Sequence, residues 1–67
     1  MTASHVAEVE ALLVRLDEMR HRVVDMAKDN ARHVASADIA EDLYGAEQAL
    51  ARAERLLRTA RKSMETE

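Results

Sequence analysis

Hydrophobic residues recur along the chain at alternating spacings of three and four, and the series runs in mirror image about Ser36 and Ala37. This spacing places residues on one face of an α-helix. The two residue numbers of each facing pair add up to the same total, as is required when two helices fold back on each other. The pairs are Val34 with Ile39, Asn30 with Leu43, Ala27 with Ala46, Val23 with Leu50, Arg20 with Ala53, Leu16 with Leu57, Leu13 with Ala60 and Val9 with Met64. The pattern predicts an all-α, antiparallel two-helix hairpin.

We expect a single domain over residues 1–67, with a first helix over about 5–34, a turn over about 35–38 and a second helix over about 39–63. Ser4 is a candidate N-cap for the first helix. Asp38 and Glu41 have the spacing of a capping box for the second. The expected turn contains neither glycine nor proline, so one continuous helix is the alternative.

Two observations favour the hairpin over a continuous helix. In each half of the chain acidic residues come first and basic residues last, up to Arg32 in the first half and from Asp38 to Lys62 in the second. This order complements the dipoles of two separate helices. The heptad phase of the first half continues to Ala37, whereas that of the second half extrapolates back to Ser36. A continuous coiled coil would keep one phase.

The chain has more apolar surface than one helix pair buries. It has 67 residues and no cysteine, so one small core must provide its stability without disulfides. Further apolar residues flank the predicted contact at heptad spacing: Leu12, Met19, Met26, Ala49 and Leu56. We interpret this flank as the interface of a homodimer that forms a four-helix bundle. A groove for a different protein is the alternative, since methionine suits adaptable surfaces.

Charge and aromatic content argue against nucleic-acid binding. The net charge is −3, and Tyr44 is the sole aromatic residue, so no base-stacking platform is available. A basic outer face on the second helix keeps a small nucleic-acid-binding regulator as the alternative function. This face consists of Arg52, Arg55, Arg58 and Lys62.

No residue pattern predicts catalysis or a cofactor. The serines lie near expected helix ends, outside any nucleophile motif, and no glycine-rich loop could hold a phosphate. Glu18 and His21 have the spacing of a carboxylate-bundle metal site but face away from the predicted contact, so this is a distant third hypothesis. Arg20 lies inside the apolar stripe, and we expect its guanidinium to reach Glu54 or Glu47.

The sequence also bears on location. The longest apolar run, 11–14, is far too short to span a bilayer, and the first residues do not resemble a signal peptide. We therefore expect a cytoplasmic, non-enzymatic helical hairpin that self-associates and acts as a protein-interaction or regulatory module.

Overall fold

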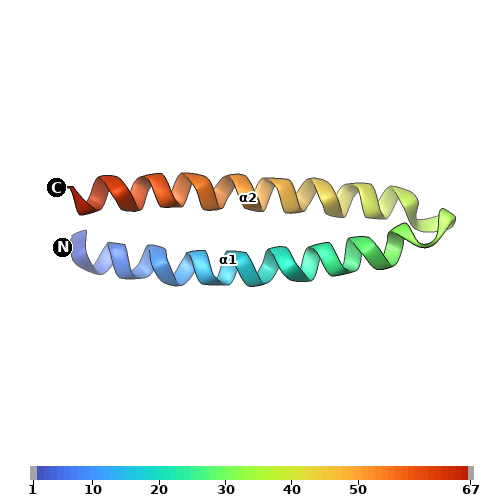
Figure 1. Cartoon of the computed structure of the whole chain (residues 1–67), viewed down its shortest axis with the longest axis horizontal. Helices are drawn as coiled ribbons and strands as arrows, with labels where there is room; N and C mark the ends of the chain where they lie inside the picture. The colour runs from blue at the N-terminus through green and yellow to red at the C-terminus, as the bar shows by residue number, and fades with distance from the viewer. Residues whose placement is uncertain (1, 67) are drawn as a thin grey trace.

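A computed structural model describes residues 2–66, with side chains from residue 5 onward. It consists of α1 (Thr2–Ala31), a short 3₁₀ turn, η1 (Val34–Ser36), and α2 (Ala37–Glu65). The two helices run antiparallel, with the turn at one end of the molecule and both termini at the other (Figure 1). The hairpin is 51 Å long and 14 × 10 Å across. The all-helical hairpin expected from the mirrored pattern is confirmed, and residues 2–66 contain no strand.

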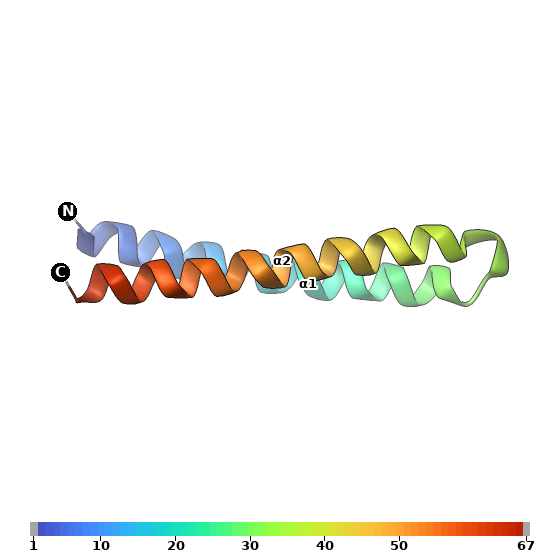
Figure 2. The same cartoon turned by 90° about the horizontal axis from the view of Figure 1, so that it is seen from above.

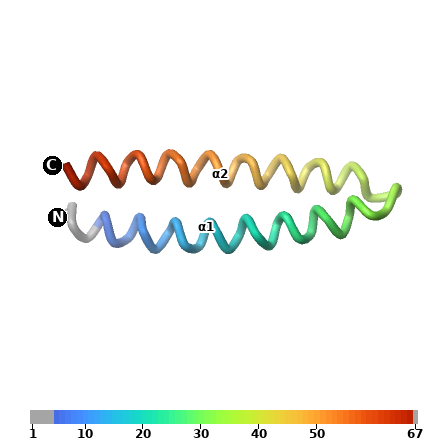
Figure 3. Tube along the Cα trace, viewed as in Figure 1, coloured from blue at the N-terminus to red at the C-terminus, as the bar shows by residue number. Residues whose placement is uncertain are grey.

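The helices are regular because the chain has no proline and only one glycine. The Cα trace runs through two even helices joined by one short loop (Figure 3). Seen from above, α1 and α2 cross at a shallow angle (Figure 2), as helices do when they wrap around each other along a shared stripe. Each helix therefore keeps one face on its neighbour for most of its length.

The turn differs from the expected boundaries. The first helix ends at Ala31, three residues early, because His33 adopts an extended backbone (φ −119°, ψ 125°). The His33 N–H donates to the Asn30 carbonyl at 3.2 Å, and the Ser36 hydroxyl donates to the same carbonyl at 3.0 Å. These two bonds satisfy a carbonyl that the helix end leaves without a partner. Ser36 therefore closes the turn.

The expected caps are also corrected. The second helix begins at Ala37, so Asp38 lies in its first turn, and the cap residue Ser36 makes no side-chain capping bond. The capping box of Asp38 and Glu41 is therefore not formed. The first helix begins at Thr2, which places Ser4 inside it rather than at its cap. The second helix ends at Glu65, two residues later than expected.

The core is a single line of contact between the helices, which we call the seam. Its buried hydrophobic side chains, among those described, are Val9, Leu13, Ala27 and Ala40. Half-buried residues continue the line, with Leu16 and Val23 on α1 and Leu43, Leu50 and Leu57 on α2.

The seam of α2 differs from the mirrored pairing in one row. Ala46 is exposed and Ala53 and Ala60 are only half-buried. The positions one residue later, Glu47 and Glu54, turn toward α1 instead, and Glu54 is buried. Two acidic residues thus occupy the middle of the contact where the pattern predicted alanine.

Candidate interaction surface

The seam divides the hairpin into two long sides of opposite character. Successive residues of an α-helix are turned by about 100° about the helix axis. In an antiparallel pair, the residues that come just before the seam positions therefore point to the same side of the hairpin on both helices. On α2 most of these positions are apolar, whereas on α1 the apolar ones alternate with Arg15 and Arg22. We call this the apolar side, and it comprises Leu12, Met19 and Met26 of α1 and Ile39, Ala46, Ala49, Ala53, Leu56 and Ala60 of α2.

The large residues of the apolar side are open to solvent in the single chain. Their exposed fractions run from 39% for Leu12 to 61% for Leu56. Met19 and Met26, one and two heptads along α1, are exposed by 46% and 48%. Isolated exposed hydrophobic residues are ordinary on a protein surface, but several of them aligned on one side make that side a candidate interaction surface.

The opposite side, which we call the polar side, is mainly charged. It carries the residues that follow the seam positions, chiefly Glu10, Asp17, His21 and Lys28 of α1 and Arg55, Arg58 and Lys62 of α2. An open groove on this side joins acidic residues of α1 to Arg58 and Arg61 of α2. That groove confirms that these residues of the two helices share one side.

The structure separates the two residue sets that the sequence singled out. The expected interface residues, Leu12, Met19, Met26, Ala49 and Leu56, are all exposed and all lie on the apolar side. The expected basic residues, Arg52, Arg55, Arg58 and Lys62, are also exposed but lie on the polar side and the outer face of α2. One helix thus presents an apolar strip and a basic strip in different directions.

An ion-pair network crosses the seam at mid-length. Arg20 donates from Nε and Nη2 to one carboxylate oxygen of Glu47, at 3.0 and 2.9 Å, and from Nη1 to Glu54 at 2.9 Å. Arg58 donates to the other oxygen of Glu54 at 3.3 Å. Glu54 is only 1% exposed. The expected pairing of Arg20 with Glu54 or Glu47 is confirmed, and it involves both carboxylates at once.

These bonds shift the acid–base equilibrium of the arginine. The hydrogen bond to Glu54, followed by that to Glu47, raises the pKa of Arg20 above its ordinary value, against the opposing effect of desolvation. Arg20 therefore keeps its positive charge, as arginine does in proteins. No buried side-chain polar atom among the described residues lacks a hydrogen-bond partner. The buried part of the network is thus fully hydrogen-bonded.

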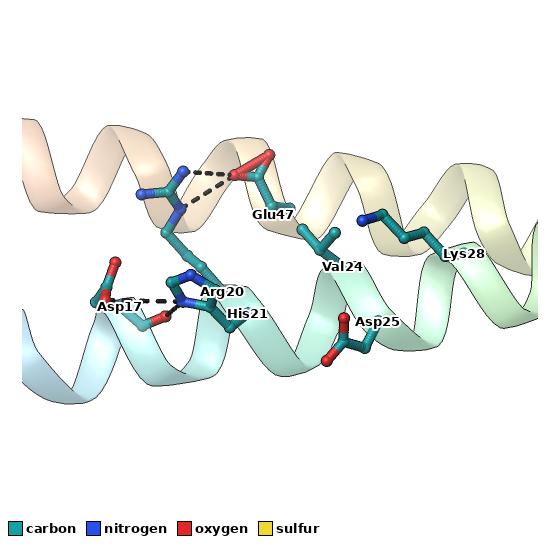
Figure 4. Close-up of a pocket in the computed structure, with 7 residues that line it drawn as sticks. All are labelled: Asp17, Arg20, His21, Val24, Asp25, Lys28 and Glu47. Carbon is teal, nitrogen blue, oxygen red and sulfur yellow. Dashed lines mark hydrogen bonds and ion pairs between the residues drawn. The ribbon is translucent and has the colours of Figure 1, made fainter.

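A second groove, of about 420 Å³, lies beside Arg20 on the polar side (Figure 4). His21 stands over Asp17, with Nδ1 2.7 Å from the backbone oxygen and 3.7 Å from Oδ2 of that residue. Both side chains are more than half exposed. Asp25 and Lys28 of the same helix, both exposed, also line the groove (Figure 4). Charges of both signs line this open groove, so it has no preference for either ionic class.

The side chains described from residue 5 to 66 include no group of three or more His, Asp or Glu residues placed to hold a metal ion. Asp17 and His21 lie side by side at the surface, with 3.7 Å between Oδ2 and Nδ1, and Asp29 pairs with Arg32 at 3.7 Å. The spacing of Glu18 and His21 is thus not accompanied by carboxylates from α2. No helix among residues 2–66 has an apolar stretch long enough to cross a bilayer.

Comparisons of the chain with protein-family models, curated proteins and solved structures find no match. The arrangement of apolar, acidic and basic residues on the hairpin is therefore the basis for any functional conclusion.

Proposed function

We propose that this chain is a non-enzymatic, self-associating helical hairpin that acts as a protein-interaction or regulatory module. The observation that carries the proposal is the apolar side, a strip that extends over both helices and leaves Leu12, Met19, Met26 and Leu56 exposed. Burial of such a strip is the main favourable contribution to helix association. A second copy of the chain is the partner that we propose.

The small core supports this choice of partner. Two of the four buried hydrophobic residues among the described ones are alanines, Ala27 and Ala40. A domain of 67 residues seldom obtains more than about 3–5 kcal/mol from one core. Covering the apolar side would double the number of packed helices and place Met19 and Met26 in a four-helix core. Association thus supplies stability that the single hairpin lacks.

The composition of the strip supports association with a copy. The apolar residues of α1, Leu12, Met19 and Met26, are all large, whereas α2 carries the small Ala46, Ala53 and Ala60 beside the large Ile39 and Leu56. A surface with both large side chains and shallow grooves can be complementary to itself, as a two-fold interface requires.

The lack of cysteine fits a reducing compartment, and a cytoplasmic location is part of the proposal.

The test compares two single substitutions that place a charge on opposite sides of α1. Met19→Glu introduces a carboxylate in the middle of the apolar side, where its burial without a partner is unfavourable. Val14→Glu is the matched control, because Val14 is also exposed, by 59%, but lies on the polar side. Sedimentation velocity and circular dichroism measure mass and helicity.

We expect Met19→Glu to abolish the dimer and to reduce helicity, while Val14→Glu remains a helical dimer. Equal dimerisation of both variants would contradict the proposed interface. A Met19→Glu chain that is monomeric and fully helical would show that the hairpin needs no partner for stability.

Nucleic-acid binding is the second candidate. Among the described ion pairs, Arg52, Arg55 and Lys62 take part in none, so their charges are available. The net charge of −3 and the single aromatic residue weigh against it. A filter-binding assay with RNA and DNA at increasing salt, repeated with Arg52, Arg55 and Arg58 replaced by glutamine, tests it. Micromolar binding at physiological salt that the triple variant loses would favour this function over the first.

A further inference from the structure

The apolar side is asymmetric, and its edges differ between the two helices. On α2 the outer edge is apolar in its middle, where Ala49 and Leu56 extend the strip beyond Ala53, and polar toward its ends, at Asp42 and Ser63. On α1 the outer edge is charged, because the exposed Arg15 and Arg22 lie next to the large residues of the strip. A second copy that covers this side has the same two edges. Its charged edge must therefore lie against either the charged edge or the apolar edge of the first copy.

Two hairpins can meet face to face about a two-fold axis in two ways. In one, the axis follows the length of the bundle, both turns lie at the same end, and α1 of each hairpin packs on α2 of the other. In the other, the axis runs across the bundle, the turns lie at opposite ends, and α1 packs on α1 while α2 packs on α2. Neighbouring helices are antiparallel in both arrangements.

The charged edge distinguishes the two arrangements. With the turns at opposite ends and the hairpins fully overlapped, Arg15 and Arg22 of one α1 lie beside Arg22 and Arg15 of the other, so that like charges face each other along the rim. With the turns at the same end, the arginines lie beside Leu56 and Ala49 of the partner, over which their aliphatic stems can extend into solvent.

Side-chain size points the same way. Arg20 bonds to both Glu47 and Glu54, so the part of α2 at its level lies midway between them. Residues of α1 and α2 at one level of the hairpin therefore have numbers that add up to about 71. With the turns at the same end, Met19 lies over Ala53 of the partner and Met26 over Ala46. Large residues then pack against small ones, which keeps the helices evenly spaced.

We infer that two copies associate through their apolar sides with both turns at the same end, α1 of each chain packing on α2 of the other. This inference rests on the proposed self-association. It also brings together the two exposed Ile39 side chains, which are 52% exposed in the single chain, at the turn end of the bundle. All four termini then emerge at the other end.

A single spin label at the turn tests this arrangement. The chain has no cysteine, so Ala35→Cys, an exposed position in η1, provides one label per chain. With the turns together, the label-to-label distance by dipolar spectroscopy is below about 30 Å, because packed helices lie about 8–10 Å apart and the linkers add the rest. With the turns apart, it is close to the 51 Å length of the hairpin.

A label at Glu18→Cys, near the middle of α1 and exposed, is the control. It gives a short distance in both arrangements and so confirms that the labelled chains are dimeric. A short distance at both positions supports the inference. A short distance at position 18 with a long or two-peaked distribution at position 35 overturns it and leaves self-association intact. Monomeric labelled chains by sedimentation would overturn the proposed function as well.

Discussion

Arg20 of α1 and Glu54 of α2 form an ion pair across the middle of the hairpin, with Nη1 2.9 Å from Oε2 and the carboxylate almost completely buried. Arg20 also bonds to Glu47, and Arg58 bonds to the second oxygen of Glu54. A buried carboxylate is retained only where hydrogen bonds replace its hydration. Only the observed register gives Arg20 both carboxylates, since a shift of α2 by one heptad in either direction would take Glu47 or Glu54 out of its reach.

We predict that Glu54→Gln lowers the free energy of unfolding by about 1–3 kcal/mol, the usual effect of leaving buried hydrogen-bonding groups poorly satisfied. Glutamine keeps the size of the side chain but presents an amide hydrogen toward one of the two arginines. Urea unfolding followed by circular dichroism measures the change. Glu10→Gln, at an exposed position on the polar side, is the control and should have almost no effect.

Replacing both partners should be far less harmful than replacing one. In the double variant Arg20→Leu with Glu54→Leu, the seam gains two apolar residues at positions that already face each other. Exchanging a buried ion pair for packed hydrophobic residues is often neutral or stabilising. We expect the double variant to be at least as stable as the natural chain. If the double variant is less stable than both Arg20→Leu and Glu54→Leu alone, the ion pair contributes net stability to the fold and does more than fix the alignment of the two helices.

Gly45→Ala should stabilise the protein by about 0.5–1 kcal/mol, because glycine inside a helix loses more backbone entropy than alanine. Gly45 lies within α2, its φ is not positive, and a Cβ there would meet nothing within 4 Å. Thermal unfolding measures the change at a fixed chain concentration. A destabilising effect would mean that a partner approaches this position closely in solution.

The hairpin could be predicted because antiparallel packing leaves a simple trace in the sequence. Leu16 and Leu57, or Val23 and Leu50, are apolar at positions with a constant sum, and the sum locates the fold-back. The ends of the helices differ from the expected ones by two or three residues. They depend on local hydrogen bonds, such as that from the Ser36 hydroxyl to the Asn30 carbonyl, which leave no periodic pattern.

The seam row of α2 shows where hydrophobic pattern alone is insufficient. Ala53 and Glu54 are neighbours, and a small rotation of α2 decides which of them faces α1. The apolar pattern favoured Ala53. Arg20 on α1 instead attracts Glu47 and Glu54, and the resulting hydrogen bonds outweigh the burial of small alanine side chains. The exposed apolar side follows from the same heptad spacing.

Self-association through the apolar side is the central claim, and sedimentation equilibrium of the natural chain tests it most directly. One chain has a mass of 7.5 kDa. Across a range from micromolar to millimolar concentration, we predict a mass that approaches twice this value and shifts toward that of one chain on dilution. A mass of 7.5 kDa at every concentration, with the chain still helical, would contradict the account.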